Sequence, residues 1–167
     1  MTYAVLGTGS VGRAVAGRLA ELGHQVTVGT RDPEATLARR EPDGMGNPPY
    51  AAWAADHPDV ALATFADAAA TADVVIHAGN GAAALELLSE AGADNLAGKV
   101  LVDISNPLDF SAGFPPTLFV KDTDSLGEQV HPDRPQAACV EEAEGRVEDP
   151  LLGRRRGHGL MVDRSVC

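Results

Sequence analysis

Residues 4–12 read Ala-Val-Leu-Gly-Thr-Gly-Ser-Val-Gly, and this stretch decides the fold of the chain. The apolar run 4–6 is typical of a short buried strand. Gly7, Gly9 and Gly12 follow it in G-x-G-x-x-G spacing. Apolar residues then recur at three- and four-residue steps, which predicts a helix with these side chains on its buried face: Val11, Val15, Leu19 and Leu22. Strand, tight turn and helix in this order are the context that a dinucleotide-binding turn requires.

Each glycine of this turn has a separate physical role in such a site. Gly7 allows the sharp turn, Gly9 lets the backbone approach a pyrophosphate, and Gly12 lets the helix pack closely on the strand. The free N–H groups at the helix start, together with the helix dipole, favour an anion. We therefore predict nucleotide contacts along the whole turn, from Gly7, Thr8, Gly9, Ser10, Val11 and Gly12. A glycine-rich turn without a ligand is the alternative.

Apolar strand-like segments alternate with helical patterns along the next hundred residues. The expected strands are 25–29, 60–64, 73–77 and 99–104, and the expected helices are 33–40, 50–56, 65–71, 82–91 and 125–130. This alternation predicts an α/β domain with a doubly wound parallel sheet, the NAD(P)-binding Rossmann fold. Ligands of such sheets lie at the carboxyl ends of the strands, which would bring four turns to one edge. The three turns beyond the glycine turn are Thr30-Arg31, Ala78-Gly79-Asn80 and Ser105-Asn106-Pro107.

The end of the second expected strand indicates which dinucleotide is bound. An NAD site has an acidic residue about 20 positions after the glycines, where it grips the ribose 2′-hydroxyl. Thr30 and Arg31 stand there instead, and a hydroxyl beside a guanidinium suits the 2′-phosphate of NADP(H). Asp32 could take the acidic role if the register differs by two residues, but it is also well placed to cap the next helix.

Composition excludes several classes of protein. The 167 residues are 44% hydrophobic and 22% charged, and the formal net charge of −11 argues against nucleic-acid or anionic-membrane surfaces. No run approaches the roughly 18 apolar residues of a membrane span. We see no signal peptide, so we expect a cytoplasmic protein. Cys139 and Cys167 form neither a disulfide framework nor a metal set, and no metal site is predicted.

Several of these motifs together resemble the NADP oxidoreductases that use the deazaflavin coenzyme, and more closely a bacterial branch of that family. The resemblance is carried by Gly-Thr-Gly-Ser-Val-Gly, Gly23-His24, residues 29–33, Asp43-Gly-Met-Gly-Asn-Pro-Pro49, the segment from Asp103 to Phe110, and residues 115–128. It covers about residues 1–130. It implies NADP(H) on the glycine turn, the Thr30-Arg31 pair at the 2′-phosphate, and Ala78, Gly79, Asn80, Asn106 and Pro107 near the nicotinamide.

The same resemblance implies hydride transfer between nicotinamide and deazaflavin. Both reacting carbons then belong to cofactors, so the protein positions two rings and needs no general acid or base. We accordingly assign no catalytic residue. His77, at the end of a strand, is the one tempting titratable group, and a satisfied structural histidine is its simpler interpretation. The resemblance further implies a small-molecule nucleotide partner and a homodimer, although the family's dimer contacts draw on a C-terminal portion whose pattern does not appear here after Val130.

The chain changes character after Val130. Residues 131–167 show no strand or helix periodicity, and we interpret them as an atypical, disordered tail, separate from a Rossmann domain at 1–130. A change of reading frame is one hypothesis for their origin. The chain could therefore be a non-catalytic NADP-binding module instead of an oxidoreductase. A short-chain dehydrogenase is excluded because neither tyrosine has a lysine four residues on, and a P-loop because Val100 follows Gly98-Lys99.

Overall fold

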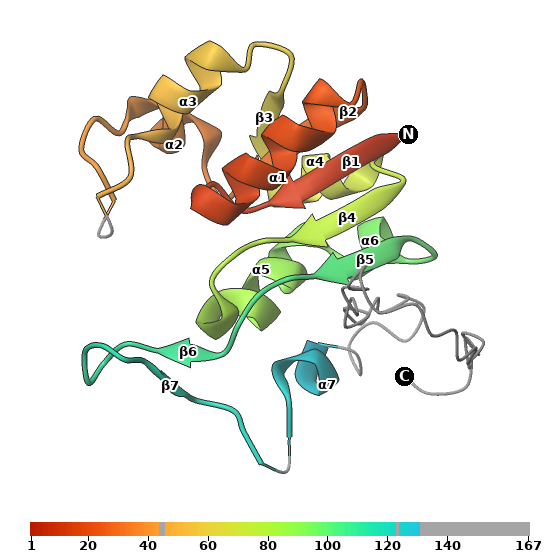
Figure 1. Ribbon diagram of the computed structural model, residues 1–167. Helices are drawn as coiled ribbons and strands as arrows, with labels where there is room; N and C mark the ends of the chain where they lie inside the picture. The colour runs from red at the N-terminus through yellow and green to blue at the C-terminus, as the bar shows by residue number, and fades with distance from the viewer. Residues whose placement is uncertain (44–45, 123, 131–167) are drawn as a thin grey trace, which may run out of the picture.

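Five parallel strands form the central sheet of the computed structural model, which describes residues 1–43, 46–122 and 124–130 (Figure 1). They are β1 (Thr2–Leu6), β2 (Gln25–Thr30), β3 (Ala61–Thr64), β4 (Val74–His77) and β5 (Val100–Asp103). Their order across the sheet is β3-β2-β1-β4-β5. From the central strand β1, the chain adds β2 and then β3 on one side. It then crosses to the other side of β1 and adds β4 and β5. This confirms the doubly wound α/β fold, and the expectation for residues 131–167 lies outside the described residues.

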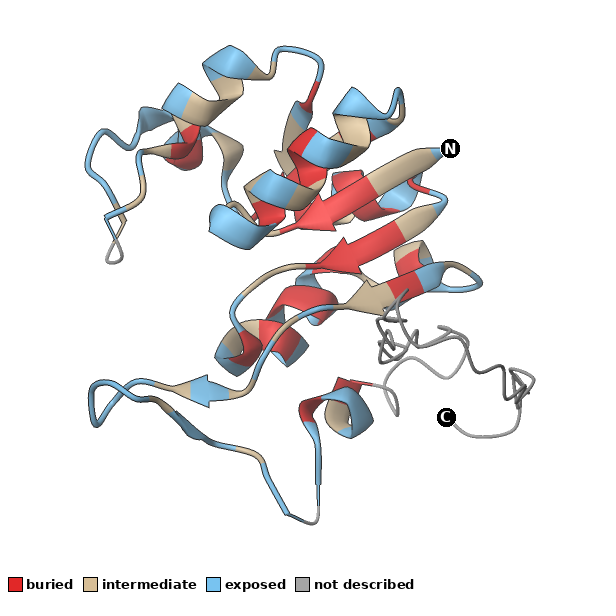
Figure 2. Cartoon of the chain, in the orientation of Figure 1, coloured by how far each residue is buried: buried red, intermediate tan, exposed pale blue. Residues whose placement is uncertain are grey.

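Helices cover both faces of this sheet. They are α1 (Ser10–Glu21), α2 (Pro33–Ala38), α3 (Tyr50–Asp56), α4 (Phe65–Thr71), α5 (Ala84–Ala91), α6 (Ala93–Leu96) and α7 (Leu126–Val130), with a 3-10 turn at Gly81–Ala83. Side chains alternate along β1, so Val5 packs in one core with α1 and α3 while Ala4 and Leu6 pack in the other with α4 and α5. Figure 2 shows the resulting burial of the central strands.

Helix α1 buries a different face from the one that the apolar spacing predicted. Its fully buried residues are Gly12, Ala16 and Gly17, whereas Val11 is 54% exposed and Leu22 is 57% exposed. The prediction was wrong for Val11 and Leu22. The buried face of α1 carries small residues instead: a Cβ on Gly12 would strike the Gly7 carbonyl, and a Cβ on Gly17 would lie 3.1 Å from Nε2 of His57, which follows α3.

Gly23 closes α1. Gly23 has a φ of 82°, its N–H donates to the carbonyl of Ala20, and the next N–H, of His24, donates to Leu19. These two bonds make a Schellman motif, which needs a left-handed residue that glycine supplies at little cost.

Two further differences from the sequence-based expectation lie in the second half of the chain. A short helix, α6, was not predicted. The segment between β5 and α7, for which no strand was predicted, contains two strands, β6 (Leu108–Asp109) and β7 (Thr117–Leu118), which pair antiparallel and form an arm. Ser125 caps α7: its hydroxyl accepts a hydrogen bond from the N–H of Glu128, and its own N–H donates to Asp124. The arm projects from the body of the sheet in Figure 1, and most of it is exposed in Figure 2.

Candidate functional site

A pocket of about 460 Å³ opens at the carboxyl ends of β1, β2 and β4, where the sheet order reverses. This is the position at which doubly wound sheets bind ligands. Its lining residues come from three of the four predicted turns and from the helices around them: Gly7, Thr8, Gly9, Gly29, Thr30, Arg31, Asp32, Ala35, Thr36, Arg39, Phe65, Ala78, Gly79, Asn80, Ala83 and Leu87.

The glycine turn forms the part of the pocket nearest β1 and β4. Gly7 has a φ of 137°, and a Cβ there would lie 2.6 Å from the carbonyl oxygen of Ala78. A Cβ on Gly12 would strike the carbonyl of Gly7, whereas a Cβ on Gly9 would meet nothing within 4 Å. Gly7 and Gly12 are therefore required by the packing of the protein itself, while Gly9 faces open space.

The start of α1 leaves its backbone donors available to a ligand. Gly9 is the N-cap residue, no side chain accepts a hydrogen bond from the first turn, and the first turn holds no acidic residue. The first N–H groups of a helix lack partners within the helix. Together with the helix dipole, they make this end of α1 suitable for a phosphate group.

Thr30 and Arg31, at the end of β2, line the pocket. Thr30 is 8% exposed, and its hydroxyl lies 2.9 Å from the hydroxyl of Thr36. The Arg31 side chain reaches α5, where its Nε lies 2.9 Å from one carboxylate oxygen of Glu90 and its Nη2 lies 3.4 Å from Glu86. The Glu90 hydrogen bond and charge, with the charge of Glu86, raise the pKa of the Arg31 guanidinium.

Asp32 acts as the N-cap of α2. Its Oδ1 accepts a hydrogen bond of 2.9 Å from the N–H of Ala35, and Pro33 occupies the first helical position. This is the capping role that the sequence suggested. The carboxylate nevertheless borders the pocket.

The turn after β4 supplies Ala78, Gly79 and Asn80 to the pocket. The N–H of Ala78 donates to the carbonyl of Leu6, which fixes the turn to β1. The side chain of Asn80 accepts from the N–H of Ala82 and caps the following 3-10 turn. The helix predicted to start at Ala82 therefore begins as a 3-10 turn and becomes α-helical at Ala84.

The remaining predicted residues lie outside the pocket lining. Ser10 and Val11 are exposed at the start of α1, and Gly12 is buried beneath Gly7. The backbone of Asn106 packs against Gly81, where a Cβ would strike the Asn106 carbonyl, and the Pro107 carbonyl accepts from the N–H of Phe119 in the arm.

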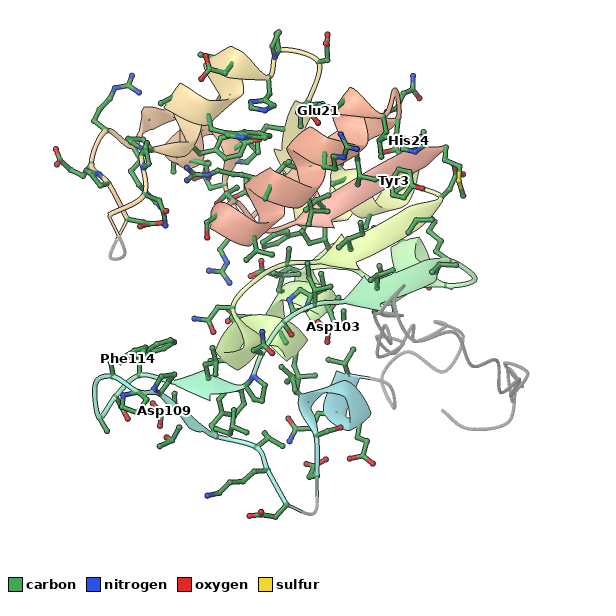
Figure 3. The ribbon with its side chains drawn as sticks, viewed as in Figure 1. Tyr3, Glu21, His24, Asp103, Asp109 and Phe114 are labelled. Carbon is green, nitrogen blue, oxygen red and sulfur yellow. The ribbon has the colours of Figure 1, made fainter. Side chains whose placement is uncertain are left out.

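A buried pair lies under the turn after β4. His77 is fully buried, and its Nδ1 lies 2.9 Å from Oδ1 of Asp103, which lies at the end of β5 (Figure 3). Burial acts to raise the pKa of Asp103, but hydrogen bonds from His77 and Ser105 outweigh it, and the pKa is lowered from its ordinary value of 3.8. The other ring nitrogen of His77, Nε2, has no hydrogen-bond partner within the described part of the chain.

Three lining residues that the sequence did not identify, Ala35, Thr36 and Arg39, share one face of α2 and its ends with Asp32. Their spacing of three, four and seven residues from Asp32 is that of a single helix face. This signal was present in the sequence, but it becomes informative only once that face is known to point toward the strand ends. Among the described residues, no group of three or more His, Cys, Asp or Glu is arranged to hold a metal ion, and no helix is long and apolar enough to cross a membrane.

The sheet order, the glycine turn and the pocket at the strand ends define a Rossmann-fold protein. The model of one family, NADP oxidoreductase coenzyme F420-dependent, matches residues 2–107, and the chain belongs to this family. This confirms the resemblance that the sequence motifs indicated.

The chain spans only part of the length of two relatives that it matches. A crystal structure from Arthrobacter sp. FB24, provisionally described as an F420-dependent NADP reductase, is 57% identical with a TM-score of 0.76. The match covers 83% of this chain and 60% of that one. A glycerol-3-phosphate dehydrogenase [NAD(P)+] of Pseudomonas syringae pv. tomato is 36% identical over 106 residues, which are 64% of this chain and 30% of the dehydrogenase.

Proposed function

We propose that this chain binds NADP(H) in the pocket at the strand ends and serves hydride transfer between the nicotinamide and a deazaflavin coenzyme. Family membership supports the oxidoreductase class. The observation that carries the proposal is the open space at Gly9 beside the uncapped start of α1, because a pyrophosphate needs both. The chain spans 60% of its solved relative, so the activity itself is a proposal.

The pocket lining offers groups that suit the charges of the cofactor. The turn Gly7–Gly12 would hold the pyrophosphate through backbone N–H groups, and Thr30 with Arg31 would face the adenosine 2′-phosphate. The turn Ala78–Asn80 would approach the nicotinamide half, with Asn106 and Pro107 further along the same edge. Bound NADP(H) would accept or give a hydride, and the chain's part is to orient the nicotinamide and exclude water.

The direct test is deazaflavin-dependent reduction of NADP+ by the purified chain. In this reaction, reduced deazaflavin gives a hydride to NADP+, and oxidised deazaflavin, NADPH and one proton result. We expect NADPH to appear only when the chain and reduced deazaflavin are both present. Isothermal titration with NADPH and NADH, run on the same preparation, tests binding separately from turnover.

A second candidate function is a binding module that holds NADP(H) without catalysis. The observation in its favour is that the chain matches 60% of the solved relative, so that the rest of that relative has no matched counterpart here. NADPH binding without deazaflavin-dependent turnover would support this module. Mass spectrometry of any co-purified nucleotide would identify the cofactor in both cases. The homodimer implied by the sequence motifs is likewise a proposal, which light scattering of the purified chain would test.

A further inference from the structure

Arg39 is a second arginine on the pocket wall, on the same face of α2 as Asp32, Ala35 and Thr36. It occupies the C-cap position of α2, one turn beyond Ala35, whose carbonyl accepts its backbone N–H at 3.2 Å. The two other polar side chains of this face already have partners. Asp32 accepts from the N–H of Ala35, and Thr36 shares a hydrogen bond with Thr30.

The two pocket arginines differ in how far they are already paired. Arg31 bonds Glu90 through Nε, at 2.9 and 3.2 Å, and has Glu86 at 3.4 Å from Nη2. The guanidinium of Arg39 makes no hydrogen bond or ion pair with any residue that the structure describes. Arg39 therefore presents its whole donor fork, while one edge of Arg31 is occupied.

This difference matters for an anion with two negative charges. Two carboxylates beside Arg31 offset its charge and would repel a phosphate that approaches the same guanidinium. A second guanidinium without an acidic partner supplies the missing positive charge, and its planar fork can hold two phosphate oxygens. Arg39 is the cation of the described pocket lining that meets this need.

We propose that Arg39 binds the 2′-phosphate of NADP(H) and is the main determinant of the preference for NADPH over NADH, with Arg31 as the second, carboxylate-paired contact. This inference rests on the proposed function, because it assumes that the adenosine half lies at the end of β2. It assigns to this chain a specificity residue that the Thr30-Arg31 motif does not include.

The matched control is the neighbouring residue. Arg40 carries the same charge, but its Nη1 bonds the carbonyl of Leu37 and its side chain does not line the pocket. Arg39→Ala and Arg40→Ala therefore change the net charge equally and differ in access to the pocket. The probes are NADPH and NADH, and then adenosine 2′,5′-bisphosphate and AMP, which differ by the 2′-phosphate alone.

Titration calorimetry on the full chain should separate the two variants. We expect Arg39→Ala to weaken NADPH and adenosine 2′,5′-bisphosphate by about tenfold or more, and to leave NADH and AMP within about twofold. Arg40→Ala should leave all four affinities within about twofold. Glu90→Gln should strengthen NADPH, because it removes a carboxylate that competes for Arg31, while Arg39→Ala should remain the more damaging change in that background.

The outcomes distinguish this inference from the proposed function. If the unaltered chain prefers NADPH and both arginine variants keep that preference, the assignment of Arg39 is overturned and the proposed function stands. If Arg39→Ala weakens NADH as much as NADPH, Arg39 contacts another part of the nucleotide and the assignment is again overturned. If the unaltered chain binds neither nucleotide, the proposed function fails, and this inference fails with it.

Discussion

A substitution at Gly9 can test ligand binding without disturbing the packing of the protein. Its φ of −71° suits any residue, and a Cβ there meets no atom within 4 Å. We therefore expect Gly9→Val to keep the melting temperature within a few degrees while its branched side chain blocks the approach of a pyrophosphate. NADPH titration should show at least tenfold weaker binding, or about 1.4 kcal/mol. Unchanged affinity would mean that this turn is structural only.

The ionisation of Asp103 makes the stability of the fold depend on pH. Its pKa is lowered by His77 and Ser105 in the folded protein, so the ionised carboxylate stabilises the fold. That contribution is present above the unfolded value, near 3.8, and is lost as the pH falls through the lower folded pKa. We expect Asp103→Asn to cost about 1–3 kcal/mol at pH 7, by loss of charge-assisted hydrogen bonds.

The measurement is the free energy of unfolding in urea between pH 3 and pH 7, for both proteins. Other carboxylates titrate in both, so the difference between the two curves isolates Asp103. The difference should shrink below about pH 4. A difference that stays constant with pH would show that the cost of the substitution is steric and not electrostatic.

The sequence predicted some site residues and missed others for a physical reason. Glycine spacing reports backbone geometry, so Gly7, Gly9 and Gly12 could be identified from the sequence alone. The Arg31–Glu90 ion pair joins residues 59 apart in sequence, and nothing local to either residue indicates the other. The pairing of His77 with Asp103 likewise depends on β4 and β5 being neighbours in the sheet.

At the scale of elements, α2 is a helix of the fold that also lines the candidate site. It has only six residues, so its stability depends on its cap and on its packing. Asp32 supplies the cap through a 2.9 Å bond to the N–H of Ala35. We expect Asp32→Ala to lower the free energy of unfolding by about 1 kcal/mol, and Asp32→Asn to preserve it, because asparagine caps equally well.

Urea unfolding of the three proteins measures this effect, and nucleotide titration adds a second reading. If Asp32 grips the ribose 2′-hydroxyl as in an NAD site, Asp32→Asn will weaken NADH although the fold is intact. If Asp32 acts only as a cap, the Asp32→Asn variant will bind both nucleotides with the same affinities as the unaltered chain. The capping geometry leads us to expect the second result.

Element boundaries were predictable where local chemistry sets them. Helices α3 and α4 match the predicted ranges, and α2 starts at Pro33 behind its cap, as predicted. Tyr50 is the buried residue of α3. Burial raises its pKa to about 12, while the charge of the Arg13 guanidinium acts to lower it. The arm of β6 and β7 was not predicted because two-residue strands are too short to show a periodic pattern of apolar residues. Apolar residues are also not buried at its tip, where Phe114 is exposed (Figure 3).

At the scale of the whole molecule, the alternation of strands and helices was enough to predict the architecture. Buried parallel strands such as β4 are apolar on both faces, and the glycine turn shows which strand stands at the centre of the sheet. The alternation did not predict where the chain packs after β5. Helix α7 follows the arm in the chain, and its apolar side chains pack in the core formed by α4 and α5. Leu126 and Val130 of α7 are 5% and 3% exposed in that core.

This packing leads to a proposal about where the domain ends. We propose that residues 1–130 form the complete nucleotide-binding domain, with α7 as its last element. Burying two side chains of this kind contributes roughly 1.5–3 kcal/mol each. A chain that stops after residue 130 should therefore unfold in urea with the same free energy as the full chain. A chain that stops after Asp122 should lose roughly 3–6 kcal/mol, because both side chains are removed from the core. If the 130-residue chain is instead less stable than the full one by more than about 1 kcal/mol, residues beyond Val130 contribute to the fold and the boundary proposed here is wrong.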